Sequence, residues 1–61
     1  MYIVQYFLKN DVLILEQKYS IRSSADELIN ELVEGAHADI KRVSPNDIIF
    51  KNDSVIRLTK I

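Results

Sequence analysis

The chain has 61 residues, of which 48% are hydrophobic and 28% charged, and its formal net charge at pH 7 is −1. This hydrophobic fraction excludes a disordered segment, the length predicts a single small domain over residues 1–61, and the near-neutral charge argues against non-specific nucleic-acid binding as the main task. The absence of cysteine excludes disulfides and cysteine-bearing zinc sites, and it fits a reducing compartment.

The first predicted element is a strand over residues 2–8, which are rich in β-branched and aromatic types. Both of its faces are apolar, which is typical of a central strand. The turn that follows at residues 9–11 contains Asn and Asp, which tolerate the positive φ of tight hairpins. Alternation gives the strand two faces: Tyr2, Val4, Tyr6 and Leu8 on one, and Ile3, Gln5 and Phe7 on the other.

A second, long strand is predicted from Val12 to about Arg22. Its alternation of apolar and polar residues indicates a strand with one exposed face. The predicted apolar face holds Leu13, Leu15, Tyr19 and Ile21, with Gln17 as the polar exception, and the opposite face holds Glu16, Lys18, Ser20 and Arg22.

An amphipathic helix is predicted to begin after Ser24. Ser24 and Glu27 have the spacing of a capping box, in which each side chain accepts a hydrogen bond from the other residue's backbone N–H. Gly35, the only glycine, is a candidate left-handed residue that would end the helix near Glu34; otherwise the helix runs to about Ala38. The apolar stripe of the helix is Ala25, Leu28, Ile29, Leu32, Val33 and Ala36.

Three further strands are predicted over residues 39–43, 48–50 and 55–61, with turns at residues 44–47 and 51–53. The resulting order is β-β-α-β-β-β. This order predicts an α+β fold, in which one helix packs on one face of an antiparallel sheet of four to five strands.

The residue types give little support for catalysis, so we expect a protein that is not an enzyme and needs no cofactor. His37 is the only histidine, and its position near the helix end, where a cation is favourable, explains it better than a metal site with Glu34 and Asp39. A single glycine cannot supply a glycine-rich phosphate loop. The glutamates of the helix fit an exposed solubilising face better than an acid–base pair.

The charges are segregated along the chain. The predicted helix carries only acidic charges, whereas all basic residues fall in predicted strands or turns. This segregation either reflects ordinary preferences, since helices favour Glu and edge strands favour Lys, or serves to steer a binding partner.

Two binding modes follow. In the preferred mode, the acidic helix face or an exposed strand edge docks on a protein partner, the edge by strand addition. In the alternative mode, a basic sheet face with a stacking tyrosine such as Tyr6 binds nucleic acid. The protein-binding candidates are Asp26, Glu27, Asn30, Glu31 and Glu34, and the nucleic-acid candidates are Lys18, Arg22, Lys41 and Arg57.

The outline of strand, strand, capped acidic helix and strand in about sixty residues resembles several small phage-encoded proteins, including inhibitors of bacterial RNA polymerase, although no motif carries this likeness. The lack of catalytic groups, the small fold and the segregated charges predict a non-enzymatic protein-binding module, such as a phage or mobile-element inhibitor of a host enzyme or defence complex. A structural homodimer with a continuous sheet is a further alternative. The opening residues lack a basic segment and are interrupted by Gln5, so we expect a soluble, cytoplasmic protein without a signal peptide or membrane span.

Overall fold

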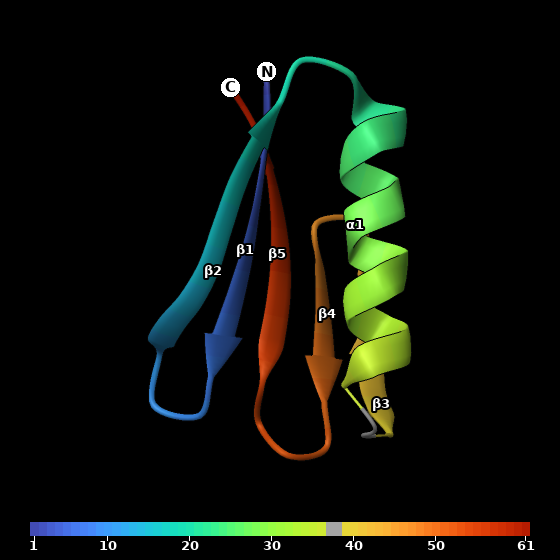
Figure 1. Ribbon diagram of the computed structural model, residues 1–61. Coiled ribbons are helices and arrows are strands. Elements are labelled where there is room, and N and C mark those ends of the chain that lie inside the picture. Colours follow the sequence, from blue (N-terminus) through green and yellow to red (C-terminus); the bar gives the residue numbers. More distant parts are fainter. Residues whose placement is uncertain (37–38) are drawn as a thin grey trace.

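The structure is a computed structural model that describes residues 1–36 and 39–61. One helix packs against a five-stranded antiparallel sheet, which confirms the predicted α+β class and the order β-β-α-β-β-β (Figure 1). The elements are β1 (Tyr2–Leu8), β2 (Val12–Tyr19), α1 (Arg22–Gly35), β3 (Ile40–Val43), β4 (Asp47–Phe50) and β5 (Val55–Lys60).

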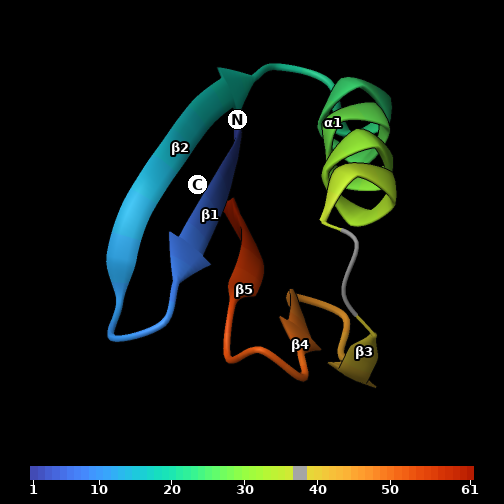
Figure 2. The ribbon, with the colours of Figure 1, turned by 60° about the horizontal axis from the view of Figure 1, so that its bottom comes forward.

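The strands lie in the order β2-β1-β5-β4-β3, and every neighbouring pair is antiparallel. β1 pairs with β2 on one side and β5 on the other, so the prediction of a central first strand is confirmed. β2 and β3 form the two edges. The chain between these edges passes through α1, which lies on the concave side of the curved sheet (Figure 2).

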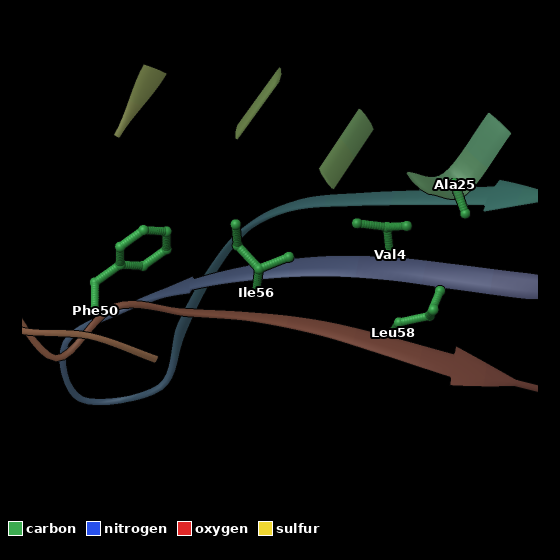
Figure 3. Close-up of a cluster of buried hydrophobic side chains, with 5 residues drawn as sticks. All are labelled: Val4, Ala25, Phe50, Ile56 and Leu58. Atoms are coloured by element: carbon green, nitrogen blue, oxygen red, sulfur yellow. The ribbon is translucent and has the colours of Figure 1, made fainter. Parts of the chain in front are cut away.

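The core lies between α1 and the sheet. α1 lies over β1, β2 and β5. Val4, Phe50 and Ile56 point from the sheet toward the helix, which contributes Ala25 (Figure 3). The predicted apolar stripe is confirmed, because its remaining members are partly buried against this core: Leu28, Ile29, Leu32, Val33 and Ala36.

The predicted helix boundaries are wrong at the N-terminus. α1 begins at Arg22, its N-cap is Ile21, and no side chain caps it. Ser24 is therefore inside the helix and cannot form the expected capping box with Glu27. β2 ends at Tyr19 because Tyr19 pairs with Tyr2, the first residue of β1, and no partner strand continues beyond it. The chain therefore leaves the sheet after Tyr19 and begins the helix earlier than predicted.

The C-terminal end of α1 also differs from the prediction. Gly35 is the last helical residue, and it does not have a positive φ. The C-cap is Ala36, with right-handed φ and ψ of −70° and −24°. The left-handed glycine cap is therefore wrong, although the predicted end near Glu34 is correct within a residue.

A β-bulge at Ile14 changes the faces of β2. Tyr6 pairs with Leu15, but Phe7 pairs with Leu13, so Ile14 is an extra residue in the ladder. Residues that pair directly across an antiparallel ladder point to the same side. Leu15 therefore lies on the helix side with Tyr6, whereas Leu13 lies on the open side with Phe7. The prediction that Leu13 and Leu15 share a face is wrong for this reason.

The two predicted Lys-Asn-Asp turns are confirmed. Asn10 and Asp11 have φ values of 66° and 59° between β1 and β2, and Asp53 has a φ of 68° between β4 and β5. Asn52 accepts hydrogen bonds at its Oδ1 from the backbone N (3.0 Å) and from the Oγ (2.6 Å) of the buried Ser54. Asn and Asp suit these turns because they adopt positive φ more readily than other non-glycine residues.

Candidate protein-binding surfaces

The outer face of α1 carries four exposed carboxylates and one exposed amide. We call this surface the acidic ridge and define it by five exposed residues: Asp26, Glu27, Asn30, Glu31 and Glu34. They are exposed because the opposite stripe of the helix packs on the core, and the helical period turns every intervening position toward solvent.

The acidic ridge is barely neutralised by the rest of the molecule. Within the described residues, the only ion pair joins Arg22 Nε to Asp26 Oδ2 at 3.9 Å, one helical turn apart. Glu27, Glu31 and Glu34 have no basic partner within that range among the described residues. The spacing of Glu27 and Glu31 (i, i+4) sets like charges side by side, which destabilises a helix by about 0.2–0.5 kcal/mol.

The charges of α1 also oppose its macrodipole. A helix is stabilised by acidic residues in its first turn and basic residues in its last turn, typically by about 0.3–1 kcal/mol each. α1 has neither. Its first residue is instead Arg22, and Glu34 lies in the last turn beside the unpaired carbonyls. This distribution is unfavourable for the isolated fold, so helix stability does not account for it.

The four basic candidates do not share one surface. Arg22 lies on α1, which corrects its expected place in a strand and shows that the helix is not purely acidic. Lys18 and Arg57 lie on the open face of the sheet, the side away from α1, opposite Ile3 and Gln5 respectively. Lys41 lies in β3, where the ladder with β4 is irregular.

The open face has a polar row and an apolar row. The polar row crosses from Glu16 through Gln5 and Arg57 to Asp47, and Gln5 Nε2 donates to Glu16 Oε1 at 2.7 Å. The apolar row crosses in register from Leu13 through Phe7 and Val55 to Ile49. Two carboxylates thus accompany Arg57, so the row is mixed in charge rather than basic.

One cation–π contact links the two rows. The Arg57 guanidinium carbon lies 5.3 Å from the centre of the Phe7 ring. Tyr6, the expected stacking residue of the nucleic-acid mode, packs against the core on the opposite face instead. Any stacking on the open face would therefore have to use Phe7, which the sequence pattern did not single out.

A shallow groove separates α1 from the loop between β3 and β4. Its volume is about 150 Å³, and its walls are mainly aliphatic. The Arg22–Asp26 pair and Asp47 are also among the residues that line it. The volume suits a single aliphatic side chain of a partner rather than a drug-sized ligand. The apolar walls are Ile29, Val43, Pro45, Ile48, Ile56 and Leu58.

Residues 1–36 and 39–61 contain no group of three or more His, Asp or Glu side chains that could hold a metal ion. His37, the candidate helix-end cation and metal ligand, lies outside the described residues. Within the described residues, no helix is both long enough and apolar enough to cross a membrane.

Comparisons with protein-family models, with curated proteins and with solved structures found no match for this chain.

Proposed function

We propose that this chain is a small non-enzymatic protein-binding module, and that its acidic ridge docks on a basic surface of a partner protein. The observation that carries this proposal is the placement of Glu31 and Glu34 near the C-terminal end of α1, against the helix dipole and without basic partners. Charges that do not stabilise their own fold can instead attract a complementary charged surface of a partner.

The mixed charge of the open face supports a protein partner over nucleic acid. Glu16 and Asp47 in the polar row would repel phosphates beside Arg57. Inhibition of a larger host enzyme or defence complex would be one use of such a module, and the identity of the captured protein tests that role.

Affinity capture from a bacterial lysate tests the acidic ridge. We expect the variant E27Q/E31Q/E34Q to lose most of the partner captured by the wild-type chain at low salt, because the attraction between the surfaces is removed. The matched control is D11N/D39N/D53N, which removes three exposed carboxylates off the helix and suits the positive φ of Asp11 and Asp53. Equal capture by the two variants would contradict the proposal.

A second candidate is the binding of a single nucleic-acid strand to the open face. It is favoured by the Arg57–Phe7 contact and by Lys18 on the same face. This candidate predicts that a labelled oligonucleotide binds with an affinity that falls steeply with salt and that Arg57→Gln weakens it. A flat anisotropy titration at low salt with both DNA and RNA would eliminate it.

A further inference from the structure

β2 is an unprotected edge of the sheet. It is eight residues long and pairs only with β1, and its outer side faces no other strand (Figure 1). Within the described residues, the backbone of residues 12–19 makes no hydrogen bond outside that ladder. Val12, Leu13 and Ile14 are 51%, 45% and 51% exposed. The bulge at Ile14 separates these apolar residues from residues 15–19, which form a regular ladder with β1 and leave their outer side open to another strand.

The opposite edge is built differently. β3 has four residues, an irregular ladder with β4, and two successive basic residues, Lys41 and Arg42. Short edges, irregular ladders and like charges all oppose strand addition by a second copy. β2 also carries a bulge, at Ile14, but its residues 15–19 form a regular ladder with β1, so this part of the edge can accept a further strand.

We propose that two copies of this chain pair antiparallel through β2, with Gln17 of both chains on the two-fold axis. This register places Glu16 of each chain opposite Lys18 of the other, which gives two symmetric pairs of opposite charge on the open face. It also places Leu15 opposite Tyr19 on the helix side. Cross-strand pairs of both kinds stabilise antiparallel sheets.

Neighbouring symmetric registers are less favourable. Centring the pair on Glu16 or on Lys18 sets two like charges directly opposite each other, which is destabilising. Centring it on Leu15 places the charged residues opposite Ile14 and Val12 and requires the ladder to cross the bulge at Ile14. The self-complementary pattern of one acidic and one basic residue, two positions apart, selects the register centred on Gln17.

The proposed dimer is independent of the proposed function. Directly paired residues point to the same side of an antiparallel sheet, so both α1 helices lie on one face of the joined sheet. Each acidic ridge lies on the side of its helix opposite the core-facing stripe, so it stays exposed in the dimer. Loss of dimerisation and loss of partner capture are therefore separate outcomes.

Sedimentation at low salt, over about 1 µM to 1 mM, tests the register by charge reversal. We expect the wild-type chain to dimerise, and Glu16→Lys or Lys18→Glu to raise the dissociation constant about tenfold or more, because each sets two like-charge pairs across the axis. Mixing the two variants should restore dimers as heterodimers, in which every cross-strand pair is again opposite in charge. A monomeric wild-type chain, or a mixture that stays monomeric, would overturn the proposal.

A cysteine cross-link provides a second test. The chain has no cysteine, so Gln17→Cys introduces a single thiol on the proposed axis. Directly paired residues in antiparallel strands have Cα atoms about 4.5–5.5 Å apart, within the range that a disulfide spans. We expect Gln17→Cys to oxidise to a disulfide-linked dimer much faster than Lys51→Cys, a control at another exposed position, in the β4–β5 turn. Equal rates would contradict the register.

Discussion

Ile21 determines how firmly α1 begins. It has the extended φ and ψ of an N-cap residue, −119° and 131°, but its side chain offers no acceptor to the free N–H groups of the first turn. It is also 61% exposed, so its apolar side chain contributes little burial. The first helical hydrogen bond, from Ala25 N to Ile21 O, is long at 3.5 Å. The N-cap is therefore a weak position that a small polar residue would improve.

We expect Ile21→Ser to stabilise the protein by about 1 kcal/mol, because the Ser hydroxyl can accept a hydrogen bond from the first turn. For a domain of this size, that gain raises the melting temperature by roughly 4–8 °C. Thermal denaturation should be compared with Ile21→Ala, which removes the same exposed apolar surface without adding an acceptor. Equal melting temperatures for the two variants would show that the N-cap hydroxyl contributes nothing.

Gly35 offers a second stabilising substitution. It is helical without a positive φ, and a Cβ atom placed on it meets nothing within 4 Å. Gly35→Ala should therefore stabilise the protein by about 0.5–1 kcal/mol, because Ala loses less backbone entropy on folding. Urea denaturation measures this gain. A loss of stability would mean that Gly35 needs a conformation closed to Ala.

Sequence patterns predicted the turn residues correctly but not the residue at which α1 begins. Asn10, Asp11 and Asp53 were predicted as turn residues because their positive φ is a local property. The start of α1 was predicted wrongly because the Ser24–Glu27 spacing is only a local signal. The pairing of β2 with β1 is a non-local constraint, and it decides where the chain leaves the sheet. The length of β1 decides where β2 must end, and no local pattern contains that information.

At the scale of elements, α1 combines a favourable buried stripe with an unfavourable exposed one. The stripe facing the core could be predicted from helical periodicity, and the exposure of the acidic ridge followed directly. The faces of β2 could not be predicted fully, because the bulge at Ile14 shifts the alternation by one residue. The open edge of β2 and the Phe7–Arg57 contact arise from strand order, so sequence reasoning did not identify them.

Weakening the acidic ridge should stabilise the helix, because its carboxylates oppose the helix dipole. We expect Glu34→Lys to raise the free energy of unfolding by about 0.5–1 kcal/mol at low salt, and Glu34→Gln by about half as much, because a cation suits the last turn and a carboxylate does not. Chemical denaturation at several salt concentrations measures both. The gain should shrink as salt rises. A gain that does not change with salt would contradict an electrostatic origin.

At the scale of the whole molecule, the structure presents three surfaces with different chemistry. The acidic ridge is charged and disfavours its own helix. The β2 edge has an exposed apolar end at residues 12–14 and a segment of mixed charge at residues 16–18, and the open face mixes an apolar row with a polar one. A dimer through β2 would display two acidic ridges on one side, so a partner with two basic sites would bind more tightly than one with a single site. The proposed partner capture and the proposed self-association use separate parts of the molecule.

The most direct test of the central claim is an amide NMR titration of the ¹⁵N-labelled chain with the captured partner. We predict that the largest signal changes fall on the acidic ridge, at Asp26, Glu27, Asn30, Glu31 and Glu34. Changes confined to β2, or to Phe7 and Arg57 on the open face, would contradict the claim that the acidic ridge is the binding surface.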